Sequence, residues 1–327
     1  MLRTVRIAGT GSYLPEKILT NYDLEKIVDT THEWIHSRSG ISERHIAAEG
    51  EATSHMAAAA ARRALDSAGL SAEDLDLIIV GTITPDMVFP NTACFVQDQI
   101  GATQAFCFDV EAACSGFLYA LDIARHYVAS GTATHVMVIG AEKLSGITDW
   151  EDRTTCVLFG DGAGAVILSA AEHGRGIMKT VMGSDGRLNE LLNVPGGGSR
   201  HPASHKTVDD RLHYMKMAGR EVFKHAVRCM SDAATQALDE CGLTVKDVSC
   251  IIPHQANARI INAIASRLGA REDQVFMNLD HVGNMSAASV PVALDEAVAA
   301  GRIKSGDIVL FVVFGGGFTW GATVLEW

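Results

Sequence analysis

The sequence has little proline, a shortage of basic residues and no long apolar run. Only 7 of its 327 residues are proline while 47% are hydrophobic, which is typical of a compact globular protein. No apolar run reaches the roughly 18–20 residues that span a bilayer, so no membrane association is expected. Residues 1–9 predict a strand and lack the apolar core of a signal peptide, so the expected location is the cytoplasm, or an organelle after processing.

The cysteines and the charge exclude further classes of protein. The seven cysteines are scattered, with no CxxC pair and no Cys/His cluster at zinc-ligand spacing, so neither a disulfide framework nor a metal site is indicated. With 27 Lys and Arg against 39 Asp and Glu, the net charge of -12 argues against nucleic acid, because phosphate binding needs a basic surface. An acidic partner would need a local basic patch.

Short β-rich runs alternate with longer helical runs along the chain. Strands are expected at Arg3–Ala8, Leu77–Thr82, Phe106–Val110, His135–Ile139, Val157–Phe159, Ala163–Leu168, Ser249–Ile252, Val275–Asn278, Ile308–Phe314 and Gly321–Glu326. Helices are expected at about Ser54–Ala68, Thr92–Ile100, Ser115–Ser130, Gly219–Cys241, Ala258–Leu268 and Ala287–Ala299. This alternation predicts an α/β protein in which helices pack on parallel strands.

An internal repeat divides the chain into two halves. Ala60–Leu70 and Ala233–Leu243 share a helical pattern at an offset of 173 residues (233 minus 60), and an Ala-Leu-Asp triplet recurs at the same offset about 60 residues further on. We therefore expect two copies of one α/β domain, residues 1–172 and 173–327, joined near Ser169–Arg175.

One cysteine lies where a strand passes into a helix. Cys114 follows the strand-like run Phe106–Val110 and opens an apolar helical run that Gly131 is expected to end. Unpaired backbone N–H groups and the positive end of the helix dipole would favour the thiolate and lower the pKa of Cys114. These residues alone leave open that Cys114 is a small buried apolar residue, as free cysteines usually are.

Two polar residues of the second half are candidate partners of this cysteine. His254 directly follows a buried strand, and Asn284 directly precedes the helix that the repeat makes equivalent to the cysteine helix. Each alone is also explained as a structural histidine or a helix cap. Because ligand sites in such sheets lie beyond the carboxyl ends of strands, the repeat predicts that both converge on Cys114 in a Cys–His–Asn site.

Six motifs run through the chain from end to end: Gly9–Pro15, Asp109–Gly116, Phe159–Ala165, Pro253–Asn257, Gly283-Asn284 with Ser286–Ser289, and Phe314–Gly321. In these motifs the sequence resembles the 3-oxoacyl-(acyl-carrier-protein) synthase III family, the initiating condensing enzymes of type II fatty-acid synthesis. The resemblance implies a thiolase-like duplicated domain, layered αβαβα with two mixed sheets. The last motif lacks the second cysteine of thiolases, and elongating synthases have two histidines where this chain has His254 and Asn284.

The resemblance implies a decarboxylative Claisen condensation without cofactor or metal. An acyl-CoA primer, expected to be acetyl-CoA, would acylate Cys114, and malonyl-acyl-carrier protein would then lose CO2 and attack the acyl group. His254 and Asn284 would donate hydrogen bonds to the enolate oxygen. The N–H of Gly316 would support the acyl oxyanion, and Phe314 would keep the carboxylate end apolar. The alternatives are an acyltransferase or ketide-forming relative of secondary metabolism, or a catalytically silent structural partner. The presence of Cys114, His254 and Asn284 argues against the silent partner.

The CoA site also follows from the resemblance. Trp34, Arg38 and Arg153 would clamp the adenine ring by stacking; without the family, Trp34 and Arg38 would be interpreted as surface helix residues. The pantetheine tunnel would be formed by Gly219, Phe223 and Asn257.

The expected partners are acyl-CoA, an acyl carrier protein and a second copy of the chain. Lys224, Arg259 and Arg267 are candidates for a basic patch that binds the acidic carrier protein. Phe89 would close the acyl pocket of the partner subunit in a homodimer and leave room for short primers.

The chain departs from the family pattern near Asn284 and in one long segment. Val282 stands where the family commonly has His or Tyr, and Met285 where it commonly has Thr. The polar segment Gly196–Lys216 is long, so a loop near the pocket is expected to differ.

Overall fold

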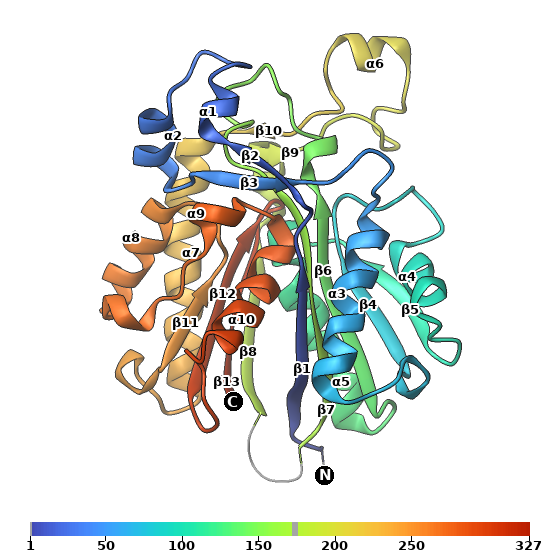
Figure 1. The fold of residues 1–327 in the computed structure, drawn as a ribbon. Coiled ribbons are helices and arrows are strands. Elements are labelled where there is room, and N and C mark those ends of the chain that lie inside the picture. Colours follow the sequence, from blue (N-terminus) through green and yellow to red (C-terminus); the bar gives the residue numbers. More distant parts are fainter. Residues whose placement is uncertain (1, 172–175) are drawn as a thin grey trace.

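The computed structural model describes residues 2–171 and 176–327. Two mixed sheets form its frame (Figure 1). The first has the order β1 (Val5–Tyr13), β7 (Asp161–Ala170), β6 (His135–Lys143), β4 (Leu77–Gly81) and β5 (Phe106–Val110). The second has the order β8 (Gly176–Ser184), β13 (Thr319–Glu326), β12 (Ile308–Gly315) and β11 (Cys250–Pro253). In the first sheet β6, β4 and β5 are parallel, and β7 pairs antiparallel with both β6 and β1. In the second sheet β11 and β12 are parallel, and β13 pairs antiparallel with both β12 and β8.

Helices fill the space between the sheets and cover their outer faces (Figure 1). The central layer holds α5 (Gly116–Ser130) and α10 (Ser289–Ala299); α3 (Thr53–Ala68) and α4 (Thr92–Ile100) cover the first sheet, and α7 (Gly219–Glu240) and α8 (Ala258–Leu268) the second. The layered α/β fold with two mixed sheets is therefore confirmed.

The central core explains why α5 is fixed so firmly. Phe117 and Leu121 of α5 are buried against Leu294 of α10 and Phe311 of β12, so one apolar cluster joins both sheets. The helix ends at Gly131, whose φ of 80° suits glycine, as the sequence predicted. The turn before α5, where Cys114 lies, is thereby held against the centre of the molecule.

The second sheet repeats the connections of the first. The strand order β1-β7-β6-β4 matches β8-β13-β12-β11, and the 3₁₀ turns Ala113–Ser115 (η2) and Ser286–Ala288 (η7) precede the two central helices. Ala113 and Ser286, at the repeat offset, share the unusual φ of 47°. We propose on these grounds that the halves are copies of one domain, joined between β7 and β8; the expected boundary at residues 172 and 173 lies outside the described residues.

Several expected elements differ from the structure. The predicted strand Val157–Phe159 is a turn whose only ladder contact is the bridge from Phe159 to Asn284, and Val275–Asn278 contributes one bridge to β11. Strand β8 was not predicted. It is the outer strand of its sheet and half-exposed from Met178 onward, so its sequence lacks a continuous apolar run.

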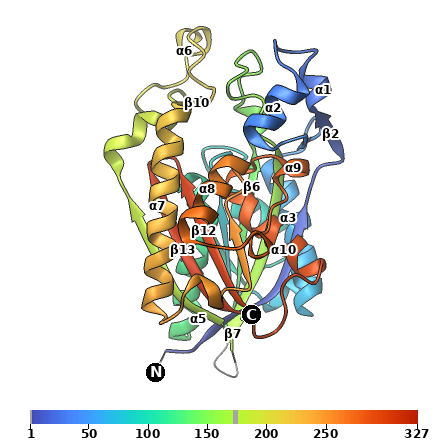
Figure 2. The ribbon, with the colours of Figure 1, turned by 90° about the vertical axis from the view of Figure 1, so that its left-hand side faces the viewer.

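Short unpredicted elements gather at the end of the molecule away from the N-terminus (Figures 1 and 2). They are β2 (Lys17–Thr20), α1 (Asn21–Leu24), α2 (His32–Ser39), β3 (Glu43–Ile46), β9 (Leu192–Asn193), α6 (His205–Asp209) and β10 (Lys216–Met217), with α9 (Leu279–Val282) beneath them. Within the described ranges, no helix combines the length and apolarity needed to cross a membrane.

Candidate active site

One cavity of about 750 Å³ brings the predicted triad together. Cys114, His254 and Asn284 all line it, and so do Phe314 and Gly316. The triad comes from three separate segments, the turn before α5, the loop after β11 and the turn before α10. The structure thus places both halves of the chain around one centre.

The backbone of Cys114 lies against the glycine-rich end of β12. A Cβ atom added to Gly315 would lie 2.7 Å from the Cys114 nitrogen and 3.0 Å from the Ser115 nitrogen. Because a side chain at Gly315 would collide with these nitrogens, only glycine lets the end of β12 pack against the backbone N–H groups of the nucleophile turn. This arrangement is suited to holding the oxygen of a bound acyl group.

The pKa of the nucleophile differs from the expectation. Cys114 is partly exposed and lines the cavity, but the protein surrounds its thiol closely enough that burial raises its pKa to about 12. The charge of Glu142 also raises this pKa, while the Ser286 hydroxyl and the N–H of Cys114 lower it. The prediction that the helix start lowers the pKa of Cys114 is wrong for the protein without bound substrate, because desolvation raises this pKa by more than the helix start lowers it. The thiol therefore holds its proton near neutral pH and must lose it during a reaction.

His254 is a buried, neutral imidazole. It is 4% exposed, and burial lowers its pKa to about 4. Its backbone N–H donates to the Val312 carbonyl at 2.8 Å, which fixes it to the neighbouring strand. Its Nδ1 finds no hydrogen-bond partner among the described residues. The ring is therefore available to a group in the cavity.

Asn284 is fixed by its backbone and by one side-chain bond. Its N–H donates to Leu158 O at 2.9 Å, and its carbonyl accepts from Gly160 N at 3.0 Å. Its Oδ1 accepts the Ser286 N–H at 2.9 Å, so the amide NH2 is the end of the side chain left to donate elsewhere. The flanking Val282 and Met285, which depart from the family pattern, are fully buried in an apolar cluster.

The predicted adenine clamp forms around Trp34. The guanidinium carbons of Arg38 and Arg153 lie 4.6 Å and 5.1 Å from the centre of its indole ring. Trp34 and Arg38 line the cavity, while Arg153 is exposed and donates to the Asp29 carbonyl at 2.6 Å. The three side chains are thus adjacent, and their role in CoA binding stays a prediction.

The predicted tunnel residues line the same cavity as the triad. Gly219 and Phe223 lie on the first turns of α7, and Asn257 caps α8 by accepting the Arg259 N–H at 2.8 Å. The Asn257 amide also donates to the Arg38 carbonyl at 3.0 Å. One cap therefore ties the end of α2 to the start of α8 at the cavity wall.

Comparison with known proteins identifies the family. The family profile described as 3-Oxoacyl-[acyl-carrier-protein (ACP)] synthase III matches residues 108–186, and the profile of its C-terminal part matches residues 238–327. The chain is similar to beta-ketoacyl-[acyl-carrier-protein] synthase III of Desulfitobacterium hafniense (strain DSM 10664 / DCB-2), with 55% identity over 324 residues, 99% of this chain and 98% of that protein. The chain belongs to the 3-oxoacyl-[acyl-carrier-protein] synthase III family.

Solved structures agree with this assignment of synthase III. The 3-oxoacyl-[acyl-carrier-protein] synthase III from Aquifex aeolicus VF5 has a TM-score of 0.92 and 51% identity, covering 99% of this chain and 100% of that chain. The priming beta-ketosynthase from the R1128 polyketide biosynthetic pathway has a TM-score of 0.92 and 36% identity, covering 99% and 96%. The predicted thiolase-like fold is confirmed.

Two of the three basic residues of the predicted carrier patch form ion pairs with acidic neighbours. Lys224 forms an ion pair with Glu221 at 2.8 Å, and Arg267 forms one with Asp232 at 2.9 Å. Arg259 is exposed at the start of α8. A carrier protein would therefore have to compete with acidic neighbours for two of the three.

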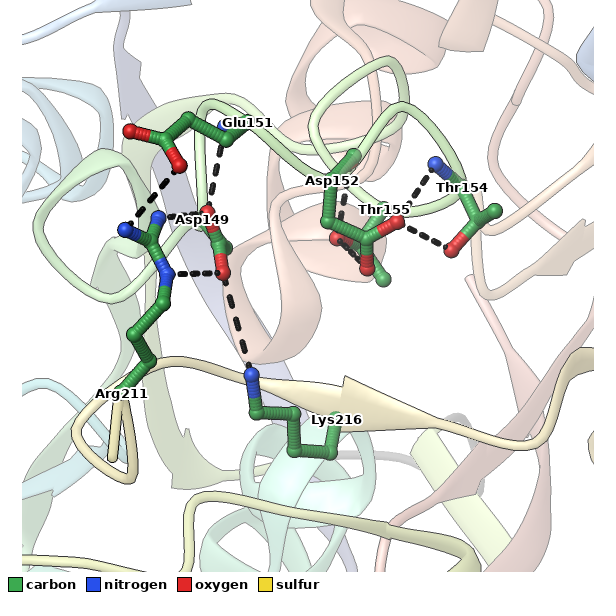
Figure 3. A network of polar contacts seen from close by, with 7 residues as sticks. All are labelled: Asp149, Glu151, Asp152, Thr154, Thr155, Arg211 and Lys216. Carbon is green, nitrogen blue, oxygen red and sulfur yellow. Dashed lines mark hydrogen bonds and ion pairs between the residues drawn. The ribbon is translucent and has the colours of Figure 1, made fainter.

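An ion network ties the long segment 196–216 to the cavity wall of this synthase III (Figure 3). Arg211 Nε donates to Asp149 at 3.1 Å, its guanidinium also contacts Glu151 at 3.1 Å, and Lys216 lies 3.8 Å from Asp149. The Arg211 guanidinium holds the pKa of Asp149 below its usual range. The adjacent Met215 lines the cavity, so the network positions part of the wall.

Asp149→Asn is expected to raise the KM for acyl-CoA about 3–10-fold with a smaller change in kcat, because a charge-assisted contact worth about 1–2 kcal/mol is lost at the wall. The matched control is Asp210→Asn on the same segment, which removes only an exposed pair with Lys206. Steady-state kinetics compare the two variants. Equal KM values would show that the network does not shape the cavity.

Sequence reasoning missed one buried carboxylate next to the nucleophile. Glu142 lies at the end of β6, is fully buried and acts on the pKa of Cys114. The available signal was a charged residue that closes the otherwise apolar run Val136–Ala141. A charged side chain buried in such a strand needs polar partners that replace the water it has lost.

Proposed function

We propose that this chain condenses an acyl-CoA primer, expected to be acetyl-CoA, with malonyl-acyl-carrier protein to give 3-oxoacyl-carrier protein, initiating type II fatty-acid biosynthesis. The observation that carries the proposal is the single cavity that Cys114, His254 and Asn284 share with Trp34 and Arg38. Family membership supports the same reaction. The reaction uses no cofactor, and the cytoplasm is the location we propose.

Acylation begins at Cys114. Its sulfur attacks the carbonyl carbon of the primer thioester, the oxyanion is held by the N–H groups of Cys114 and Gly316, and the CoA thiol leaves. Exchange of one thioester for another is nearly isoenergetic, so the acyl-enzyme can form without an energy source. The Trp34, Arg38 and Arg153 clamp would hold the adenine end of CoA, and Gly219, Phe223 and Asn257 its pantetheine arm.

Decarboxylation generates the carbon nucleophile. Loss of CO2 from the malonyl group leaves an enolate, and the neutral His254 ring and the Asn284 amide donate hydrogen bonds to its oxygen. Phe314 is buried and packs at a tilt against Phe318, with 4.7 Å between ring centres, so it presents an apolar surface that disfavours the carboxylate. The enolate carbon then attacks the acyl group on Cys114.

A homodimer is part of the proposal. Strand β5 is one of the two outer strands of the first sheet, and Phe106 on it is 48% exposed. In the loop before α4, Val88 and Phe89 are 91% and 82% exposed. An outer strand has unpaired backbone groups, and the exposed apolar side chains beside it favour the binding of a second chain. Phe89 does not line the cavity of its own chain, so a pocket role for it needs the partner subunit.

Phe89→Ala is expected to move primer preference toward longer acyl-CoAs, because removing the ring enlarges the partner's acyl pocket. The ratio of kcat/KM for octanoyl-CoA to that for acetyl-CoA should rise about 10-fold or more. Val88→Ala, at the adjacent exposed position, is the control. An unchanged ratio in Phe89→Ala would exclude a pocket role for the ring.

Arg259→Glu is expected to lower kcat/KM for malonyl-carrier protein about 10-fold at low salt, with the deficit shrinking as salt screens the charges. Arg62→Glu, exposed on α3 over the other sheet, is the control. If both reversals give the same kinetics at low salt, the carrier protein docks elsewhere.

The function is tested by supplying a panel of acyl-CoA primers with malonyl-carrier protein and measuring CO2 and 3-oxoacyl product. CO2 release matched by product with acetyl-CoA supports the proposal. The likeness to the R1128 priming ketosynthase favours one second candidate, a ketide-forming enzyme, which would condense only other primers. Acyl transfer without CO2 would indicate an acyltransferase.

A further inference from the structure

Four segments meet beside the nucleophile so closely that only glycine fits at two of the contacts. A Cβ atom added to Gly81, at the end of β4, would lie 2.7 Å from the Gly116 carbonyl carbon, and one added to Gly140 of β6 would collide with the Ala287 carbonyl. A Cβ atom added to Gly116 would lie 3.5 Å from the Ala287 Cβ, at ordinary contact distance. The ends of β4 and β6 thus meet the turns that carry Cys114 and Ser286.

This contact brings Glu142 to the same place. Gly140 and Glu142 lie two residues apart on β6, so they share the face of the strand that touches the turn Ser286–Ala288. Ile83, one of the cavity-lining residues, follows the end of β4 and donates its N–H to the Glu142 carboxylate at 3.2 Å. The carboxylate therefore lies directly behind the cavity wall.

The carboxylate is held by hydrogen bonds mainly at one oxygen. The Thr84 hydroxyl donates to Oε2 at 2.6 Å and the Thr82 hydroxyl at 3.2 Å. From the described residues, Oε1 receives only the shared Ile83 N–H at 3.3 Å. Donors of this kind let a fully buried carboxylate stay ionised, and Oε1 keeps the capacity to accept one more hydrogen.

Ser286 lines the cavity together with Cys114 and begins the turn that packs against Gly140, two residues before Glu142 on β6. It lowers the pKa of both Cys114 and Glu142, so it is close to each. Its Oγ is buried and makes no hydrogen bond of ordinary length and angle with any residue of the described chain. A buried hydroxyl needs a partner, and the thiol and the carboxylate are two groups whose pKa values it affects.

We propose that Glu142 is a positioning residue that takes up, through the Ser286 hydroxyl, the proton that Cys114 releases when it is acylated. This inference rests on the proposed function. Among the described residues, the groups that donate hydrogen bonds to Glu142 are the Thr82 and Thr84 hydroxyls and the Ile83 N–H, none of which titrates near neutral pH. The charge of Glu142 in turn acts on the pKa of Cys114.

The protons balance over one turnover. On acylation the S–H bond of Cys114 breaks as its S–C bond to the acyl group forms; the proton moves to Ser286 Oγ, and the Ser286 proton moves to Glu142. The C–S bond of acyl-CoA breaks, and the CoA thiolate takes a proton from solvent. On condensation the enolate carbon displaces Cys114 as a thiolate, which recovers its proton from Glu142 through Ser286. One solvent proton is consumed overall, as decarboxylative condensation requires.

The relay predicts how acylation depends on pH. Burial raises the pKa of Glu142 to about 7, and the Thr84 hydroxyl is the strongest influence that lowers it. Below this pKa the carboxyl already holds a proton and cannot accept another. The rate of Cys114 acylation should therefore fall as the pH drops through about 7, and loss of the Thr84 hydroxyl should move this fall to higher pH.

The test is single-turnover acylation by acetyl-CoA, followed by mass spectrometry from about pH 6 to 9. Glu142→Gln should lower the rate at pH 8 about 10²-fold and abolish the fall near pH 7. Ser286→Ala should do the same. The double variant should be no slower than either single variant, because each single substitution already interrupts the same proton relay. Thr84→Val should move the fall to higher pH, and Thr84→Ser, which keeps the hydroxyl, should not.

Two results would overturn the relay. One is a wild-type pH profile of acylation in Glu142→Gln. The other is faster acylation in Glu142→Gln, which would mean that the charge of Glu142 only disfavours the Cys114 thiolate. If Glu142→Gln does not fold, Thr84→Val and Thr84→Ser test the relay instead: equal pH profiles in these two variants would overturn it. If no acyl-CoA acylates the wild type, the proposed function fails; alkylation of Cys114 by iodoacetamide, which releases the same proton, then tests the relay over the same pH range.

Discussion

Cys114→Ala is expected to remove acyl-enzyme formation and to lower condensation by a factor on the order of 10⁴ or more, because the covalent intermediate cannot form. Single-turnover acylation and steady-state release of 3-oxoacyl product measure the two effects. Loss of CO2 from malonyl-carrier protein should persist, because its hydrogen-bond donors are on His254 and Asn284.

Cys241→Ala is the matched control for this variant. Cys241 is a free, partly exposed cysteine at the end of α7 and does not line the cavity, so its removal should leave both rates within about twofold. Acylation of the Cys114→Ala protein at the wild-type rate would mean that another side chain is the nucleophile.

His254→Ala and Asn284→Ala are each expected to lower malonyl decarboxylation about 10²–10³-fold while acylation of Cys114 stays within a few fold, because each removes one donor to the enolate oxygen. CO2 release and acyl-enzyme mass separate the two steps. Because the pKa of His254 is lowered to about 4, the ring should be neutral, and its contribution constant, at all pH values well above 4.

His225→Ala controls for loss of an imidazole elsewhere. His225 lies 5.5 Å from the Phe318 ring, outside the cavity lining, so decarboxylation should be nearly unchanged. If His254→Ala lowers acylation and decarboxylation equally, His254 acts on the thiol instead of the enolate, and the assigned division of roles is wrong.

The central elements were predictable because local pattern and tertiary packing agree in them. Helix α5 has an apolar face that both sheets bury, a start defined by Cys114 and a stop at Gly131. The repeat offset predicted that Asn284 lies before the helix equivalent to α5, where the structure has it. The convergence of Cys114, His254 and Asn284 on one cavity follows from these placements, and their roles stay predictions.

Features that depend on burial or on distant partners could not be predicted. The high pKa of Cys114 comes from desolvation, which the sequence around it does not encode. Glu142 reaches the site through the contact of Gly140 with Ala287, across nearly half the chain. Arg211 meets Asp149 only because two irregular loops fold together. Strand β8 takes its conformation from pairing with β13, against a weak local pattern.

The most direct test of the account is peptide mapping of the protein after incubation with acetyl-CoA, followed by addition of malonyl-carrier protein. The account predicts one acetyl mass on the peptide that contains Cys114, and its disappearance as CO2 and 3-oxobutanoyl-carrier protein form. An acetyl group on another residue, or one on Cys114 that malonyl-carrier protein does not discharge, would contradict it.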